Sequence, residues 1–108
     1  MKSIAVLPTI CCGPEMEPLT VPERVNLAAQ FKALADPTRV AIINSLSAAE
    51  EVCVCNLTET FELSQPTISH HLRLLREAGL VEASRRGTWA YYRLIPEAVA
   101  ELRTALGA

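Results

Sequence analysis

Four cysteines carry the most reactive side chains of this 108-residue chain, and they fall into two close pairs. Cys11 and Cys12 are adjacent, and one residue separates Cys53 from Cys55. In a reducing compartment such thiols act as ligands of soft metal ions or as redox groups, rather than as a disulfide framework. Because three or four thiolates select thiophilic ions, the cysteines predict a soft-ion site or a redox site.

Geometry limits how these thiols can meet. Side chains two apart on an ideal helix point to different faces, so Cys53 and Cys55 can share an ion only where the first helical turn is distorted. Adjacent Cys11 and Cys12 can converge only in an irregular backbone, which the proline-rich residues 1–19 permit. We therefore predict that residues 1–19 are a flexible N-terminal arm that carries Cys11 and Cys12.

Basic charge gathers in a single part of the chain. Residues 64–93 hold five arginines and two glutamates, whereas residues 1–63 hold four basic and eight acidic residues. A chain with a net charge of −2 is not a general polyanion binder, but a local group of arginines is what a phosphate backbone requires. The alternative interpretation of these arginines is an ordinary solvated face.

Size and composition bound the elements that position these side chains. The length fits one domain, and half of the residues are apolar, which is enough for a modest core. No uncharged stretch approaches the roughly 18–20 residues of a membrane helix, and Pro8 cuts the first apolar run short of a signal peptide. We expect a cytoplasmic protein with no membrane partner, whose folded domain spans residues 20–108.

Capping signals predict the first two helices. Thr20 and Glu23 form a capping box for a helix that continues up to Asp36. Asp36 then caps a second helix, in which Pro37 takes the first helical position. The residues that we expect on the buried side of the second helix are Val40, Ile43 and Leu46.

The next two helices are predicted to form a pair. A short helix runs from about Val52 to Phe61, and a longer one begins after the cap Ser64 and ends at Gly79. In the longer helix apolar residues recur at helical spacing and face the core, which leaves a polar and basic outer face. These core residues are Ile68, Leu72 and Leu75.

The pattern changes from helical to extended after Gly79. β-Branched and aromatic residues flank the turn Arg86-Gly87 and predict a β-hairpin with arginines at its tip. Pro96 then opens a last helix. The order α-α-α-α-β-β-α indicates a mostly α fold of the α+β class, the winged helix-turn-helix.

Each part of this fold suits contact with DNA. The second helix of the pair lies in the major groove with its N-terminal residues at base edges, and arginines at the hairpin tip reach phosphates or the minor groove. The residues that we assign to DNA contacts are Gln65, Thr67, Ser69, His70, Arg73, Arg85 and Arg86. No glycine-rich phosphate cradle accompanies the cysteines, so a thiol-dependent enzyme is disfavoured.

Three segments, in the same chain order, resemble the ArsR/SmtB family of metalloregulatory repressors. They are Ala33-Leu34-Ala35-Asp36-Pro37-Thr38-Arg39, Glu51-Val52-Cys53-Val54-Cys55-Asn56-Leu57 and Leu63-Ser64-Gln65-Pro66-Thr67-Ile68-Ser69-His70-His71-Leu72. The resemblance covers about residues 24–106. It implies a homodimer, formed mainly by the first and last helices, that binds pseudo-palindromic operator DNA and leaves it when a metal or metalloid binds.

The segment Cys53-Val54-Cys55 is similar to the signature of the arsenical and cadmium/lead branches of this family. In the arsenical branch a further cysteine often follows three residues later, where this chain has Thr58. The remaining thiols must then come from Cys11 and Cys12, and the resemblance implies that the arm of one protomer meets the helix of the other.

We interpret the chain as an arsenical-responsive repressor with As(III) or Sb(III) as inducer. The predicted metal ligands are Cys11, Cys12, Cys53 and Cys55. One alternative is a repressor that responds to Cd(II) or Pb(II) through all four cysteines. Another is a redox-sensing repressor, in which a cysteine of the arm forms a disulfide with Cys53 or Cys55.

A metal site on the last helix is not expected. The zinc and nickel branches of the family use histidine and carboxylate ligands there, but residues 95–108 contain no histidine. His70 and His71 are neighbours whose side chains do not face each other on a helix. We assign His70 to DNA and His71 to packing or to a backbone contact.

Overall fold

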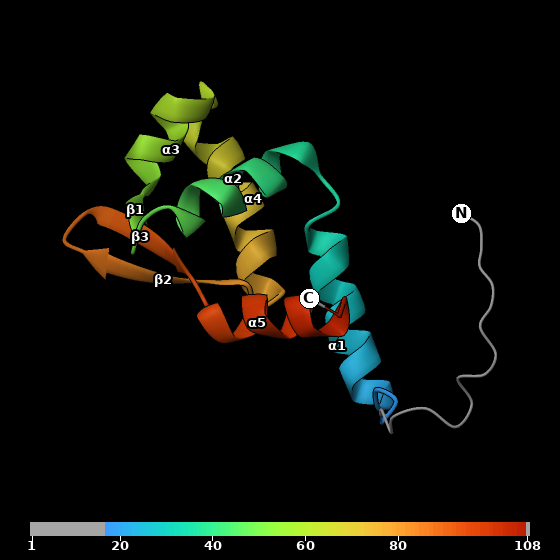
Figure 1. Ribbon diagram of the computed structural model, residues 1–108. Coiled ribbons are helices and arrows are strands. Elements are labelled where there is room, and N and C mark those ends of the chain that lie inside the picture. Colours follow the sequence, from blue (N-terminus) through green and yellow to red (C-terminus); the bar gives the residue numbers. More distant parts are fainter. Residues whose placement is uncertain (1–16, 108) are drawn as a thin grey trace.

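The computed structural model describes residues 17–107, which form five helices and one three-stranded sheet. In chain order the elements are α1 (Val21–Ala33), α2 (Pro37–Ser47), β1 (Val52–Cys53), α3 (Val54–Phe61), α4 (Gln65–Glu77), β2 (Val81–Arg86), β3 (Trp89–Leu94) and α5 (Pro96–Ala105) (Figure 1). The predicted winged helix-turn-helix is confirmed, with α3 and α4 as the helix pair and β2–β3 as the wing. Cys11 and Cys12 lie outside the described residues.

The predicted caps are the ones that begin the helices. At α1 the Thr20 side chain accepts from the Glu23 backbone and the Glu23 side chain accepts from the Thr20 backbone, which completes the capping box. At α2 and α4 the caps are Asp36 and Ser64, each followed by a proline in the first helical turn. α4 ends before Gly79, whose φ of +82° is accessible to glycine at little energetic cost.

The strand β1 differs from the prediction, which assigned Val52 and Cys53 to the start of the third helix. Val52 pairs with Tyr92 and Cys53 with Tyr91, so β1 becomes the edge of an antiparallel sheet with the order β1-β3-β2. The helix begins only at Val54. A two-residue strand has no periodicity of its own, and its partner lies far along the chain, so the sequence gives no local signal for it.

The wing is a regular hairpin whose register runs from Val81 opposite Leu94 to Arg86 opposite Trp89. The turn is therefore Gly87-Thr88, one position later than the predicted Arg86-Gly87, and Gly87 takes a φ of +62° there. Since side chains alternate along a strand, Arg85 and Arg86 point to opposite faces of the wing.

The core joins α2, α3, α4 and the base of the wing. Its fully buried large side chains are Ile42, Leu46, Leu57, Ile68, Leu72, Leu75, Leu80 and Val81. The prediction for α4 is therefore confirmed at all three of its core positions. The prediction of Val40 is wrong, because this side chain is 51% exposed and Ile42, four residues before Leu46, takes the buried position.

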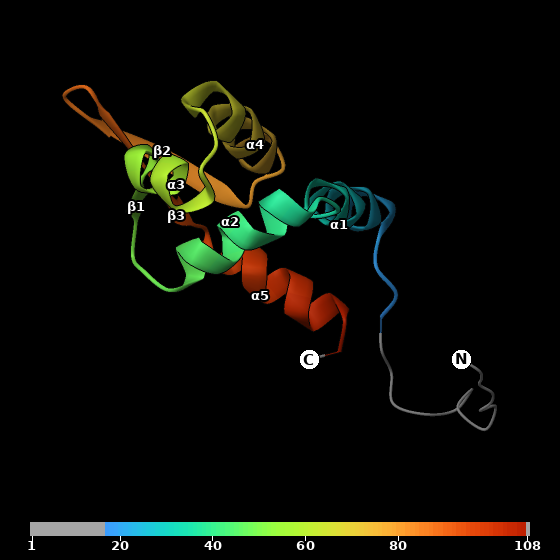
Figure 2. The same ribbon diagram turned by 90° about the horizontal axis from the view of Figure 1, so that it is seen from above.

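α1 lies at the opposite end of the molecule from the wing, as both ribbon views show (Figures 1 and 2). Several large apolar side chains on or beside α1 and at the end of α5 remain exposed in the single chain. They are Leu19, Val21, Val25, Phe31 and Leu106. Within residues 17–107, no helix has the length and apolar character needed to cross a membrane.

The core that orients α4 gives a first prediction. Leu72→Ala removes a side chain that is 0% exposed and is expected to lower the free energy of unfolding by about 2–5 kcal/mol. Arg73→Ala, at the exposed neighbouring position, is expected to change it by less than about 0.5 kcal/mol. Urea titrations of both variants measure the difference, and similar losses would contradict this placement of the core.

Candidate functional site

The outward face of α4 carries the first group of predicted site residues. Because Ile68, Leu72 and Leu75 are buried, the other side of the helix faces solvent. All five residues of α4 that were assigned to DNA are exposed there. They are Gln65, Thr67, Ser69, His70 and Arg73.

Two hydrogen bonds order side chains on this face. The hydroxyls of Thr67 and Ser64 lie 2.9 Å apart at the start of the helix. One turn further on, Arg73 Nη2 lies 3.0 Å from His70 Nδ1. The helix therefore presents partly ordered donors and acceptors, which lowers the entropy that a partner must remove when it binds.

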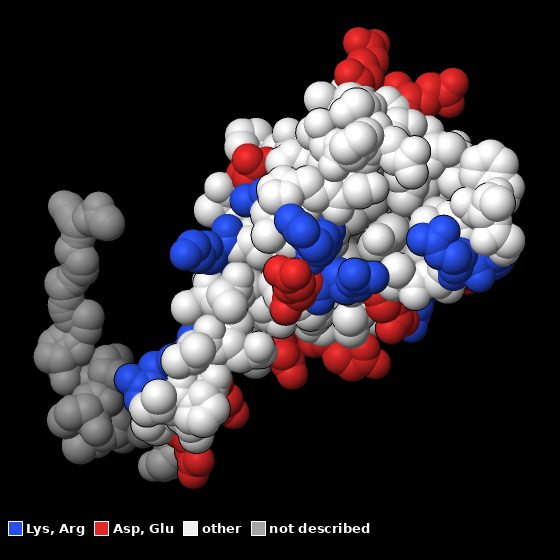
Figure 3. Space-filling view, turned by 180° about the vertical axis from the view of Figure 1, so that it is seen from behind, with Lys and Arg blue, Asp and Glu red and all other residues white. Residues whose placement is uncertain are grey.

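Basic side chains accompany α4 on the same side of the molecule. Figure 3, seen from behind Figure 1, shows Lys and Arg side chains over the middle of the molecule and at the wing, with acidic groups mostly near the edges of that face. Arg85 and Arg86 are both exposed on the wing. This arrangement provides a polar helix flanked by positive charge, which is suited to a duplex backbone.

A small junction fixes α4 against α1 and α2. Arg39 donates from Nε to the carbonyl oxygen of Ala33 at 2.6 Å, and its Nη1 lies 3.1 Å from His71 Nδ1. His71 Nδ1 is also 4.0 Å from Asp36 Oδ2. The partly buried His71 thus packs against charged groups of α2, in agreement with its assignment to packing, and Arg39 is a contributor that the sequence analysis missed.

Asp36 is the cap at this junction, where its Oδ2 accepts from the backbone N–H groups of Thr38 at 3.0 Å and Arg39 at 3.1 Å. The Arg39 N–H is the largest influence and lowers the pKa of the Asp36 carboxyl below its ordinary value. Desolvation opposes this shift, while the charges of Arg39 and His71 and the Thr38 N–H strengthen it. The ionised carboxylate is therefore the form that the fold favours.

The second group of predicted site residues is the cysteine pair, which lies where β1 passes into α3. Cys53 has extended backbone angles and is the N-cap of α3, and its sulfur accepts from the Cys55 N–H at 3.3 Å. Because Cys53 lies outside the helix, the two sulfurs meet on one side. This follows from the later start of α3 and not from the distorted first turn that the sequence analysis required. Cys53 is 7% exposed, whereas Cys55 is exposed.

The structure joins Cys53 and Cys55 in a disulfide across a separation of two residues. The redox alternative expected a bond from this pair to Cys11 or Cys12, so the partner found here is a different one. A bond between such near neighbours closes a very short loop and does not link distant elements. It is therefore not a structural framework, and its reduction gives two thiols, those of Cys53 and Cys55.

Two sulfurs are fewer than the three that a pyramidal As(III) or Sb(III) centre takes. Among residues 17–107, no group of three or more His, Cys, Asp or Glu side chains is placed to hold a metal ion. The donor type of Cys53 and Cys55 fits a thiophilic ion, but the described residues supply only part of its coordination. The assignment of Cys11 and Cys12 as the missing ligands stays a prediction.

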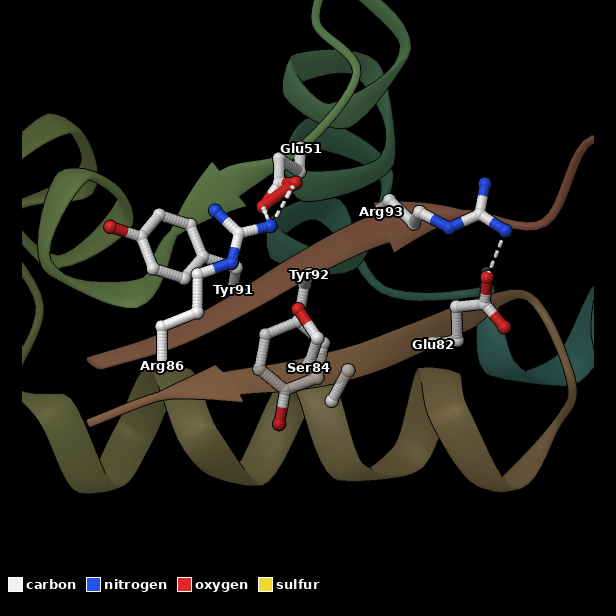
Figure 4. A pocket seen from close by; sticks show the side chains of 8 residues that line it. Glu51, Glu82, Ser84, Arg86, Tyr91, Tyr92 and Arg93 are labelled. Carbon is white, nitrogen blue, oxygen red and sulfur yellow. Dashed lines mark hydrogen bonds and ion pairs between the residues drawn. The ribbon is translucent and has the colours of Figure 1, made fainter. Parts of the chain in front are cut away.

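The sheet face beside the cysteines holds an ion pair that the sequence analysis did not assign. Glu51, just before β1, binds the guanidinium of Arg86 at the end of β2 (Figure 4). A second pair joins Glu82 and Arg93 along the same hairpin. Glu51 is the first residue of the segment Glu51–Leu57, which carries part of the family resemblance. This place in the segment is the sequence feature that could have identified Glu51.

Comparison with known proteins assigns this fold and these motifs to one family. Residues 36–83 match the family model described as bacterial regulatory protein, arsR family. An uncharacterised HTH-type transcriptional regulator of Methanocaldococcus jannaschii is 42% identical over 81 residues, which cover 74% of this chain and 91% of that protein. The chain belongs to the ArsR family. It is accordingly a DNA-binding transcription regulator and not an enzyme.

Two further relatives of this ArsR-family chain carry names that refer to resistance. The arsenic resistance transcriptional regulator ArsR1 of Pseudomonas putida is 54% identical over 67 residues, covering 62% of this chain and 52% of that protein. The cadmium resistance transcriptional regulatory protein CadC homolog of Staphylococcus aureus is 44% identical over 78 residues, covering 72% and 64%. The match thus spans about half of the first protein and just under two thirds of the second.

Solved structures of ArsR-family type agree with the fold. A crystal structure of a possible transcriptional regulator for arsenical resistance has a TM-score of 0.67 and 40% identity, and the match covers 73% of this chain and 81% of that one. The solution structure of a homodimeric winged helix-turn-helix DNA-binding domain from Mycobacterium bovis has a TM-score of 0.67 and 32% identity, with 85% and 87% covered.

The cap at the α1–α2 junction gives a second prediction. Because the pKa of Asp36 is lowered on folding, its ionisation stabilises the fold above the unfolded-state pKa of about 4, and this contribution is lost as the pH falls through the folded-state pKa. Asp36→Asn keeps a capping oxygen but cannot titrate. The stability of this variant is therefore expected to fall less than that of the wild type between about pH 6 and pH 3, the range in which carboxylates usually titrate.

Urea midpoints across that pH range measure the effect. Asp36→Ala is the control, since it removes the cap as well and is expected to be less stable than either protein at neutral pH. Parallel acid profiles for the wild type and Asp36→Asn would refute the role of the carboxylate charge.

Proposed function

We propose that this chain is a homodimeric repressor that leaves operator DNA when As(III) or Sb(III) binds to its cysteine thiols. The observation that carries the proposal is the convergence of the Cys53 and Cys55 sulfurs at the start of the first helix of the helix-turn-helix. An ion held at this place contacts the element that supports α4. Binding of ion and binding of DNA then influence each other through one structural unit.

The DNA-binding part of the proposal rests on α4 as the recognition helix. Its N-terminal half presents Gln65, Thr67, Ser69 and His70 to solvent. These side chains offer the mixed donors and acceptors that distinguish base pairs in the major groove. Arg73 on the same helix and Arg85 on the wing supply charge for the phosphates on either side.

The dimer part rests on the exposed apolar side chains of α1 and the end of α5. Val21, Val25 and Leu106 are 61%, 64% and 70% exposed in the single chain. Burial of such side chains against a second copy is favourable, and the M. bovis relative is a homodimer. Two-fold symmetry then matches a pseudo-palindromic operator with half-sites spaced by whole helical turns.

The choice of ion rests on the number and type of the thiols. Cys53 and Cys55 supply two sulfurs, and Cys11 or Cys12 supplies the third that a pyramidal As(III) or Sb(III) centre requires. Binding of Cd(II) or Pb(II) through all four cysteines is the alternative, and relatives named for arsenic and for cadmium resistance match this chain.

The deciding experiment is a titration of the protein–DNA complex. Fluorescence anisotropy follows a labelled duplex, selected from a random pool by binding to the reduced wild-type protein, while arsenite, antimonite, cadmium or lead is added. Release at near-stoichiometric arsenite with a weak response to cadmium supports the proposal. Release by cadmium or lead alone assigns the chain to the four-thiolate alternative, and no release by any ion refutes an ion-sensing role.

Cysteine substitutions predict which thiols bind the ion. Cys55→Ser is expected to leave DNA affinity within about twofold of wild type and to abolish release by arsenite, because an alcohol is a poor ligand for a soft ion. The Cys11→Ser/Cys12→Ser double variant is expected to lose release in the same way. Loss of DNA affinity along with the response would instead indicate a folding role for the cysteine.

Position 58 offers a gain-of-function control for that prediction. Thr58 follows Cys55 by three residues in α3, where the two side chains lie on the same helix face. Adding Thr58→Cys to the Cys11→Ser/Cys12→Ser double variant supplies a third thiol next to the other two. Arsenite is expected to release DNA again, and Thr58→Ser in the same background is expected not to restore release.

Contacts to bases and to phosphates are expected to separate in the same assay. Gln65→Ala is expected to reduce affinity for the selected duplex much more than affinity for a scrambled one. Arg85→Ala is expected to weaken binding to both duplexes and to reduce the salt dependence of log K by about one for each wing that touches DNA. A sequence-specific loss in Arg85→Ala would contradict the assignment of the wing to the backbone.

A thiol redox sensor is the second candidate function, and the disulfide between Cys53 and Cys55 is the observation that favours it. In this case two thiols give two electrons and two protons to an oxidant such as peroxide, and the new bond alters the start of α3. Reversible release of DNA by peroxide, in the presence of a metal chelator, distinguishes this function from ion sensing.

A further inference from the structure

The ion pair beside the cysteines engages a residue that was assigned to DNA. Nη2 of Arg86 lies 2.5 Å from both carboxylate oxygens of Glu51, and the Arg86 guanidinium lies 4.5 Å from the centre of the Tyr91 ring (Figure 4). A carboxylate and an aromatic face thus hold the guanidinium from two sides. One of its terminal nitrogens, Nη2, is therefore directed to Glu51 instead of outward to a phosphate.

The strand register places this pair on the same side of the sheet as Cys53. Tyr91 is opposite Cys53 in one strand pair and opposite Ser84 in the other, and Arg86 follows Ser84 by two residues. Side chains of paired residues, and of residues two apart on a strand, share a face. Cys53, Tyr91 and Arg86 therefore line a single face, and Arg85 belongs to the other.

Glu51 connects the cysteine pair to the wing, through the backbone on one side and through its ion pair with Arg86 on the other. It lies two residues before Cys53, so a change in backbone position at β1 moves it directly, while its carboxylate contacts the far end of β2. The pair is not sealed from water, since the side chains of Arg86 and Glu51 are 57% and 32% exposed. Exposed ion pairs are weak, so a DNA phosphate is able to compete for Arg86.

We propose that Glu51 is a positioning residue that makes Arg86 available to, or withdraws it from, the DNA backbone according to the state of Cys53 and Cys55. When the two sulfurs are tied together, as in this structure, Glu51 captures Arg86. When the thiols are free, β1 is less constrained and a phosphate takes the guanidinium. The inference rests on the proposed DNA-binding function, but it does not depend on which ion is the inducer.

The test uses the full chain with Cys11→Ser and Cys12→Ser, so that only Cys53 and Cys55 can form a disulfide. Diamide ties the sulfurs together by accepting two electrons and two protons from the two thiols, and mass spectrometry verifies the single bond. The salt dependence of log K is measured for the reduced and oxidised proteins on the duplex selected above. This slope counts phosphate contacts, which a merely structural role of Glu51 leaves unchanged.

The oxidised protein is expected to show a slope smaller by about two than the reduced protein, one contact for the Arg86 of each protomer in a dimer. Glu51→Gln in the same background is expected to give equal slopes in both states. Glu50→Gln removes the same charge from the neighbouring exposed position and is expected to keep the difference. Arg86→Gln is expected to give the smaller slope in both states.

Two outcomes overturn the inference: equal slopes for the two states of the parent protein, or an equal difference in Glu51→Gln and Glu50→Gln. Thermal unfolding of each variant verifies that it folds, and Glu51→Asp, which keeps the charge but shortens the reach to Arg86, is expected to behave as Glu51→Gln. Failure of arsenite to release DNA from the wild type refutes the proposed inducer. It leaves this result unaffected, because the Cys11→Ser/Cys12→Ser protein is tested without an ion.

Discussion

The pairing of β1 with β3 is the constraint on which the rest of the site depends. It is only two residues long, yet it holds Val52 and Cys53 in an extended conformation immediately before α3. Were the helix to begin earlier, Cys53 and Cys55 would point to different faces. Because the strand ends at Cys53, this residue caps the helix, and its sulfur meets that of Cys55. This short strand pairing thus brings the two thiols together in one site.

The same strand pairing joins that site to the wing. Cys53 is paired with Tyr91 of β3, and Glu51 reaches across to Arg86 of β2. α3 in turn packs against α4 through Leu57 and the buried face of α4. A group bound by the two sulfurs is therefore linked to both elements that we assign to DNA contacts, to α4 by packing and to the wing by strand pairing. Such a shared element is what linkage between two ligands requires.

Features set by local interactions were predictable from the sequence. The caps Thr20, Asp36 and Ser64 and the spacing of Ile68, Leu72 and Leu75 each involve residues within a few positions of one another. Features set by distant partners were not. β1 forms because β3 offers it a free edge, Arg86 turns to Glu51 because of the strand register, and Val40 loses its predicted burial to Ile42 through packing of the whole helix.

The junction at Arg39 has a consequence for the geometry of the DNA site. One guanidinium holds the carbonyl of Ala33 at the end of α1 and the imidazole of His71 on α4. In a dimer joined through α1, this contact sets the angle of each recognition helix to the two-fold axis. The separation of the two helices, and with it the number of base pairs between half-sites, is then fixed by a side chain that need touch neither DNA nor the other protomer. Selection for a differently spaced operator would therefore act on this partly buried junction before it acted on any base contact.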